Sequence, residues 1–298
     1  MVTIGNFDGV HRGHREIFRR VSQYARTAGC TSVVVTFSPH PLQVLNPDKA
    51  PLLITTPAQK RALIAENDLD LLVVIPFDPN FAAIPADRFV REILVAGLGL
   101  RHLVIGHDYA FGRGREGNEA LLAQLATQLG FVLEVLDPVG EGALIFSSSE
   151  VRRLVRAGEV GAAVAILGRY HRISGQVVHG REIGRSLGFP TANIVTENQL
   201  IPADGVYAVW VEAGDELHMG ACSIGTNPTF DGAERTIEAF LFDFDGSLYG
   251  QEIVVHFAAR LRGLARFPDA VALKAQIGQD VAAARGVLSA ALPAGRPV

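Results

Sequence analysis

The sequence predicts an α/β protein in two parts, a doubly wound parallel sheet followed by an antiparallel β-barrel with a C-terminal helix. In the first half of the 298 residues, runs of β-branched residues alternate with helical patterns, as in parallel sheets whose strands are joined by helices. In the second half, strand-like runs follow one another without helices between them until one long helical pattern near the end. That arrangement is typical of a barrel.

The first half begins with a short apolar strand at residues 2–4, and an amphipathic run follows at residues 15–26. Further strands are expected at residues 31–37, 69–77, 102–106 and 131–136, and helices at residues 57–67, 85–96 and 118–129. The alternation predicts a Rossmann-like sheet, in which ligands bind past the carboxyl ends of the strands. The turns at residues 5–14, 38–41 and 107–112 lie at such ends.

The pattern changes at Gly168, after a helical stretch over residues 147–166. Strands are then expected at residues 171–179, 205–212, 217–225, 236–244 and 252–257, and a helix at 269–292. We therefore expect two domains, residues 1–167 and residues 168–298.

The composition narrows the class of protein. Hydrophobic residues make up 48% and charged residues 19%, which suits a globular protein with sizeable cores. The net charge of −4 and the lack of a basic stripe argue against nucleic-acid binding. No run is apolar enough to span a bilayer, and no signal peptide is visible. Cys30 and Cys222 form neither a disulfide framework nor a metal site, so we expect a reducing cytoplasm.

The segment Gly5–His14 reads GNFDGVHRGH and joins the first strand to the first helix. At a spacing of three, in the first turn of a helix, the rings of His11 and His14 point the same way. The helix start adds backbone N–H groups and a positive dipole end, which suit phosphates. The alternative is a plain strand-to-helix turn with two surface histidines. The candidate phosphate-binding residues here are Gly5, Asn6, Phe7, Asp8, Gly9 and Gly13.

A second candidate anion site follows Phe146. Ser147, Ser148 and Ser149 place three hydroxyls at a helix start, and Arg152 adds a guanidinium one turn later. The alternative is an N-capped helix with a solvated arginine. None of the three lysines of the chain lies in a GxxxxGK[ST] loop, so bound ATP would not use a P-loop.

The second half contains the string GREIGRSLGFPTAN at residues 180–193. Thr191 and Asn193 lie two apart on one side of an extended chain, where their oxygens can ligate Mg²⁺ together with a nucleotide. Glu238, in a strand-like run of apolar residues, suits a base acting on a hydroxyl. The alternatives are a glycine-rich surface loop and an outward-facing strand carboxylate.

These motifs together resemble one family. GNFDGVHRGH resembles the HxGH signature of nucleotidyltransferases, in the form found in bacterial bifunctional riboflavin kinase/FAD synthetases. SSSEVR resembles the SSTxxR motif of that family, with Ser149 in place of threonine. GHDYAFG and TFSPHP resemble its flavin-side elements VGxDFxFG and TFxPHP. GFPTAN looks like the riboflavin kinase signature, and RGLARF at residues 262–267 resembles the RxxxKF loop of the kinase.

The resemblance implies roles for individual residues. His11, His14 and Glu238 would be catalytic, and Thr191 and Asn193 would hold Mg²⁺ with ATP. The ATP or phosphate would also contact Ser147, Ser148, Ser149, Arg152, Gly180, Arg181 and Gly188 beside the residues of the first turn. The flavin would contact Phe37, Asp108, Phe111, Arg262 and Phe267. For Phe37 and Phe111, core packing remains an alternative.

The resemblance therefore implies a cytoplasmic enzyme that phosphorylates riboflavin to FMN and adenylylates FMN to FAD, using ATP and Mg²⁺ in both steps. Flavins would be its substrates and products, with no tightly bound prosthetic group, and neither nucleic acid nor membrane as a partner. One alternative is a riboflavin kinase whose first domain only binds nucleotide or flavin. The reason is that the first strand starts at Met1, and so short a start could weaken adenylylation. Another is a flavin-binding regulator, although binding alone needs no general base such as Glu238.

Overall fold

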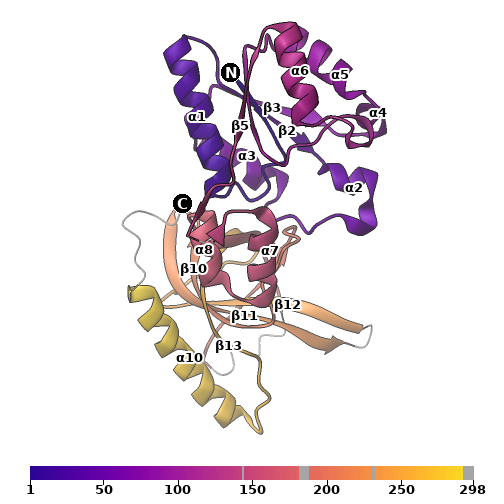
Figure 1. Ribbon diagram of the computed structural model, residues 1–298. Coiled ribbons are helices and arrows are strands. Elements are labelled where there is room, and N and C mark those ends of the chain that lie inside the picture. Colours follow the sequence, from indigo (N-terminus) through magenta and orange to yellow (C-terminus); the bar gives the residue numbers. More distant parts are fainter. Residues whose placement is uncertain (143, 181–187, 230–231, 291–298) are drawn as a thin grey trace. The chain divides into compact units, whose positions relative to one another are not determined.

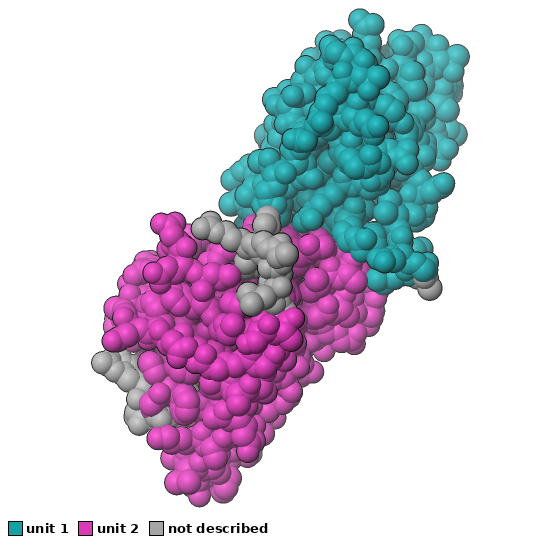
Figure 2. Space-filling view, turned by 90° about the vertical axis from the view of Figure 1, so that its left-hand side faces the viewer, with its two compact units in different colours: residues 1–148 teal, residues 149–298 magenta. Residues whose placement is uncertain are grey.

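The computed structural model describes residues 1–142, 144–180, 188–229 and 232–290 (Figure 1). The chain divides into two compact units, residues 1–148 and 149–298 (Figure 2). This division lies ahead of the boundary after residue 167 that the sequence pattern predicts. Helix α8 (Val160–Leu167) packs against strands of the barrel, which places it in the second unit.

The first unit contains a five-stranded parallel sheet, as predicted. Its strands are β1 (Val2–Ile4), β2 (Val33–Ser38), β3 (Leu71–Pro76), β4 (His102–Gly106) and β5 (Val132–Leu136), in the order β3-β2-β1-β4-β5. The first strand of the chain is therefore the central one, paired with β2 and β4. The run Val33–Phe37 is buried throughout, as expected for a strand covered on both faces.

Helices cover both faces of this sheet. On one face, α1 (Arg12–Ala28) and α3 (Pro57–Ala65) pack through Phe18 and Leu63 against Val34 of β2. On the other face, α5 (Ala86–Arg88), η2 (Phe89–Gly97) and α6 (Glu119–Leu129) pack through residues such as Leu94 and Leu122. The doubly wound arrangement is confirmed.

Some elements of the first unit differ from the expectation. The helix predicted at residues 85–96 is a short α-helix followed by the π-helical segment η2. The short elements that the sequence pattern did not predict are α2 (Pro41–Leu45), η1 (Pro47–Lys49), α4 (Pro79–Ala82), η3 (Arg113–Arg115), β6 (Gly140–Glu141) and β7 (Leu144–Ile145).

A break also divides the helix predicted at residues 147–166. Gly158, with a φ of +80°, separates α7 (Ser148–Ala157) from α8. A positive φ ends a helix, and glycine adopts it without a Cβ penalty.

The second unit is a closed antiparallel barrel, as predicted. Its strands are β8 (His171–Val178), β9 (Ala192–Thr196), β10 (Gly205–Ala213), β11 (Glu216–Thr229), β12 (Gly232–Leu241) and β13 (Glu252–Arg262), in the order β10-β11-β12-β9-β8-β13. The strand pattern did not identify β9, whose residues follow the glycine- and proline-containing stretch at 188–190. Helix α10 (Ala270–Ala290) covers part of the outer face, where Ala284 and Leu288 meet Trp210 and Phe242.

Among the described residues, no helix is both long and apolar enough to cross a membrane.

Candidate active sites

The turn between β1 and α1 lies at the carboxyl edge of the central strand and has an unusual backbone. Phe7, Gly9 and Val10 have φ values of +47°, +81° and +39°. Positive φ is uncommon for residues that carry a Cβ, and rarest for a β-branched residue such as Val10. Backbone strain of this kind clusters at binding and catalytic sites. Glycine is also favoured at position 5, since a Cβ there would lie 2.8 Å from the ring of Phe7 and would displace it.

His11 and His14 lie side by side at the start of α1. Their rings stack with centroids 3.6 Å apart, and the ring of Phe7 meets that of His14 edge-on at 5.2 Å. His11 is the N-cap, and its Nδ1 accepts the backbone N–H of His14 at 3.4 Å. In a neutral ring this leaves the proton on Nε2, the donor form that a phosphate oxygen needs.

Gly13 allows this pair to form. A Cβ at Gly13 would lie 3.1 Å from the ring of His11 and 3.4 Å from the carbonyl oxygen of Phe146. The structure therefore brings the two predicted histidines together. Gly13 packs closely against the ring of His11, where a larger residue would crowd it.

Asp8, predicted to bind phosphate, has its carboxylate engaged elsewhere. The side chain is 4% exposed and accepts the backbone N–H groups of Ile54 and Thr55, as well as the hydroxyl of Thr55, at 3.0–3.2 Å. A buried carboxylate with these partners favours a structural role over contact with a phosphate anion.

The serine motif lies beside the same turn. The hydroxyl of Ser148 donates to the carbonyl oxygen of Asp8 at 2.9 Å. Just before it, the ring of Phe146 lies 4.5 Å from the guanidinium carbon of Arg12. Ser147 occupies the position immediately before α7. The first unit thus places Ser147 and Ser148 next to the segment that carries the histidines.

Ser149 and Arg152 follow on α7, in the second unit, with Ser149 exposed and Arg152 half-buried. Their contact with ATP stays a prediction.

The predicted flavin-side aromatics of the first unit are largely buried. Phe37 and Phe111 belong to the same hydrophobic core, where both contact other aromatic rings, Phe81 at 5.9 Å and Phe89 at 5.8 Å. Phe111 also stacks on Tyr109 at 5.4 Å. This favours core packing for much of each ring. Asp108, in contrast, is exposed in the turn after β4.

Two polar residues at this edge of the sheet, Lys60 and Thr36, were not predicted from the sequence. The ammonium of Lys60 donates to the carbonyl oxygens of Asn6 and Phe37, and to the hydroxyl of Thr36. The sequence showed only that Lys60 lies outside a P-loop. Its contacts join residues far apart in the chain, for which a single sequence carries no signal.

The kinase-like residues of the second unit gather on neighbouring strands. Glu238 of β12 lies opposite Asn193 of β9 on one side and opposite Ser223 of β11 on the other. Ile237 and Ala239 point into the barrel core, so the alternation of a strand puts Glu238 on the outer face. The hydroxyl of Thr191 donates to the Glu238 carboxylate at 3.3 Å. The predicted base and the two predicted metal ligands are therefore brought together.

The glycine-rich string of the second unit is partly described. A Cβ at Gly180 would overlap the side chain of Asn193, so any other residue where this stretch begins would displace that side chain. Gly188 has a φ of +88°, which also favours glycine. The predicted ATP contact Arg181 lies outside the described residues.

Arg262, predicted to contact flavin, is held by another residue. Its guanidinium donates to both carboxylate oxygens of Asp280 on α10, at 2.6–3.1 Å, and Asp280 is buried. Phe267 lies 5.8 Å from the guanidinium carbon. The ion pair joins β13 to α10, which favours a structural role for much of this side chain.

Metal ligation can be judged from the donors present. Within the described residues, no group of three or more His, Cys, Asp or Glu side chains could hold a metal ion. Mg²⁺ that acts with ATP is usually held by one or two protein oxygens plus phosphates. The oxygens of Thr191 and Asn193, beside the Glu238 carboxylate, fit that kind of site.

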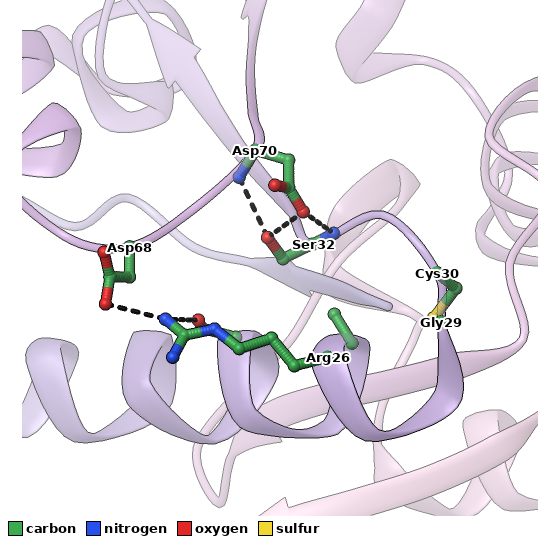
Figure 3. Close-up of a pocket in the computed structure, with 8 residues that line it drawn as sticks. Arg26, Gly29, Cys30, Ser32, Asp68 and Asp70 are labelled. Carbon is green, nitrogen blue, oxygen red and sulfur yellow. Dashed lines mark hydrogen bonds and ion pairs between the residues drawn. The ribbon is translucent and has the colours of Figure 1, made fainter.

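A small pocket lies away from both sites, at the amino ends of β2 and β3 (Figure 3). Its polar side chains bind one another: Arg26 pairs with Asp68 at 2.6 Å, and the N–H and hydroxyl of Ser32 donate to Asp70 at 2.8 and 2.6 Å. These hydrogen bonds lower the pKa of the Asp70 carboxyl. The polar side chains of this pocket are therefore engaged with one another, which indicates a structural role.

Comparison with known proteins gives matches along most of the chain. A family model described as FAD synthetase matches residues 1–150, and one described as riboflavin kinase matches residues 167–288. The bifunctional riboflavin kinase/FMN adenylyltransferase of Escherichia coli (strain K12) is 38% identical over 295 residues, which cover 99% of this chain and 94% of that protein. The protein of the same name from Pseudomonas fluorescens is 38% identical over 288 residues, covering 96% and 92%.

One solved structure is similar over nearly the same length. A crystal structure described as a macrolide-efflux protein from Streptococcus pneumoniae has a TM-score of 0.87 and 32% identity, and the match covers 95% of this chain and 93% of that chain. Its description differs from the names of the curated relatives, while its similarity agrees with the fold found here.

Proposed function

Because the chain belongs to the family of bifunctional riboflavin kinase/FMN adenylyltransferases, we propose that each of its two halves carries one of the two reactions. The protein phosphorylates riboflavin to FMN with ATP, and it adenylylates FMN to FAD with release of pyrophosphate. We assign adenylyl transfer to residues 1–167 and the kinase reaction to residues 168–298. The matches to residues 1–150 and 167–288 support this division.

For adenylyl transfer we assign the chemistry to the turn at the end of β1. The phosphate of FMN attacks the α-phosphorus of ATP and pyrophosphate leaves, so the protein must align the two phosphates and stabilise spreading negative charge. His11 and His14 would donate to the phosphate oxygens, helped by the first N–H groups of α1. The observation that carries this assignment is the stacked pair of rings, 3.6 Å apart at a helix start. Ser147, Ser148, Ser149 and Arg152 would complete the phosphate contacts.

For the kinase reaction we assign the chemistry to the outer face of the barrel. Glu238 would accept the proton of the attacking riboflavin hydroxyl as that oxygen bonds to the γ-phosphorus, while the bond from that phosphorus to the bridging oxygen breaks and ADP leaves. Thr191 and Asn193 would hold Mg²⁺ with ATP, and that ion, when bound, neutralises charge on the phosphates. The support is the convergence of Asn193 on β9, Glu238 on β12 and Thr191, the residue just ahead of β9.

The flavin contacts remain the proposals made from the motifs. Phe37, Asp108 and Phe111 would serve FMN in the first unit, with Asp108 the most accessible of the three. Arg262 and Phe267 would serve riboflavin in the second, with Arg262 held in place by Asp280. Flavins are substrates and products here, so we expect no tightly bound prosthetic group. The free thiols of Cys30 and Cys222 favour a reducing, cytoplasmic location.

Chromatography of the products formed from riboflavin, ATP and Mg²⁺ tests the proposal. FMN and FAD together are expected. FMN alone would indicate a kinase whose first unit only binds nucleotide or flavin, and the absence of both products would contradict both enzymatic assignments.

A further inference from the structure

Lys60 connects the ends of two central strands. It lies in the first turn of α3, and its Nζ is 3.2 Å from the carbonyl oxygen of Asn6 and 2.9 Å from that of Phe37. A third contact, also 3.2 Å, is with the hydroxyl oxygen of Thr36, which itself donates to the carbonyl of Asn6 at 3.2 Å. An ammonium has three N–H donors and no acceptor. All three donors are thus used within the protein.

The residues just ahead of α3 hold the turn at a second point. Ile54 and Thr55, just ahead of α3, donate their backbone N–H groups to the carboxylate of Asp8. Asn6 and Asp8 flank Phe7, where the positive φ values begin. Helix α3 and the residues before it therefore form hydrogen bonds to the strained turn on both sides of Phe7, at Asn6 and at Asp8.

We propose that Lys60 is a positioning residue for adenylyl transfer, which fixes the turn carrying His11 and His14 by binding the carbonyl of Asn6. The inference rests on the adenylyl-transfer site proposed for the first unit. The alternative role for a cation at the carboxyl edge of a parallel sheet is direct contact with a phosphate. The three acceptors that already surround Lys60 argue that it acts through the protein backbone instead.

The surroundings of Lys60 agree with this role. Burial lowers the pKa of its ammonium, and the nearby carboxylate of Asp8 opposes that shift. A charged group is kept in such a place only when its hydrogen bonds are satisfied. Methionine retains much of the length of lysine but has no donors, so Lys60→Met removes the three contacts with little change in packing.

The full-length Lys60→Met variant is assayed for both reactions in the same preparation. We expect kcat for FMN adenylylation to fall roughly 10- to 100-fold, as for a misplaced catalytic group. The KM for ATP should stay nearly constant, because the lost contacts are not with ATP. Riboflavin phosphorylation should be unchanged. Lys49→Met, at an exposed lysine of the same unit, is the matched control and should retain both activities.

Two further variants separate positioning from a general loss of structure. Lys60→Arg keeps the charge and several donors, and should restore part of kcat. Thr36→Val keeps the branched shape but removes the hydroxyl that joins Lys60 to Asn6, and should lower kcat for adenylylation alone. If Lys60→Met fails to fold, Thr36→Val decides the matter.

The proposal is overturned by unchanged adenylylation in Lys60→Met or, where that variant is unfolded, in Thr36→Val. It is also overturned by a loss that appears mainly as a higher KM for ATP, which would make Lys60 a nucleotide contact. Failure of the proposed function is distinct: the unaltered protein would then make no FAD from FMN, or His14→Ala would leave adenylylation intact.

Discussion

The hydroxyl of Thr191 donates a hydrogen bond to the carboxylate of Glu238 across 3.3 Å. This contact joins a proposed metal ligand to the proposed base, and the pairing of β9 with β12 fixes their spacing. The side chain that would receive the proton of riboflavin is therefore oriented by Thr191, the residue just ahead of β9, which would itself help to hold Mg²⁺ with ATP.

Glu238→Gln tests the proposed base. The amide keeps the size of the side chain and an acceptor for Thr191 but cannot take up a proton, so FMN formation should fall by about 10²-fold or more. FAD formation from added FMN should persist. Flavin chromatography measures both. Glu252→Gln, at an exposed position at the start of β13, is the control. Loss of both activities in Glu238→Gln would contradict separate sites.

His14→Ala tests the adenylyl-transfer site, and here adenylylation and not phosphorylation should be impaired. Removing one donor to a developing charge should lower FAD formation by about 10²- to 10³-fold. Riboflavin phosphorylation, measured in the same sample, should be unaffected and serves as the internal control. Full adenylylation activity in this variant would remove His14 from the site.

Gly180→Ala tests whether Asn193 must keep its place. The added methyl group would overlap the side chain of Asn193, so riboflavin phosphorylation should slow and require more Mg²⁺ for half-maximal rate. The measurement is a titration of kinase rate against Mg²⁺. Gly286→Ala, in α10 where a Cβ meets open space, is the matched control and should titrate like the unaltered protein. An unchanged titration for Gly180→Ala would argue against Asn193 as a metal ligand.

Acid stability should depend on Ser32 and Asp70. The pKa of Asp70 is lowered from 3.8 by hydrogen bonds from Ser32. The folded state thus favours the ionised form, and its contribution to stability is present above pH 3.8 and is lost as the pH falls through the lowered value. Ser32→Ala should therefore unfold at a lower temperature than the unaltered protein at pH 7, and the difference should narrow in acid.

Thermal unfolding at several pH values measures this effect. Asp68→Asn, in the same pocket, is the control. Both partners of the Asp68–Arg26 pair are exposed, and such pairs contribute little. Asp70 is also exposed, but its donor Ser32 is buried, so a small but larger effect is expected for Ser32→Ala. A difference between Ser32→Ala and the unaltered protein that stays constant with pH would argue against the role given to Asp70.

Most of the fold could be predicted from the sequence because its strands are locally encoded. The β2 run is buried throughout and rich in valine, so hydrophobic pattern alone identifies it. The spacing of His11 and His14 similarly follows from the geometry of one helical turn, and the two rings are indeed stacked.

Tertiary contacts decided what the sequence could not reveal. The partners of Asp8, a predicted phosphate ligand, could not be identified from the sequence, because Ile54 and Thr55 are distant from it in the chain. The same holds for the contact of Lys60 with Asn6, and for the pairing of Arg262 with Asp280. Strand β9 escaped notice because it is short and follows a loop-like stretch, and only its pairing with β8 and β12 defines it. The catalytic roles themselves stay predictions until variants are measured.

The late closure of the barrel determines the order in which the two units can fold during synthesis. The sheet of the first unit is complete once β5 ends at Leu136, whereas the barrel closes only when β13 pairs with β8 and β10. A chain leaving the ribosome can therefore form the sheet first. Meanwhile β8 and β10 expose unpaired edges, which can join to other chains. We expect aggregation during synthesis to begin in the second half of the chain. We also expect the turn carrying His11 and His14, proposed for the second reaction, to form before the barrel proposed for the first reaction.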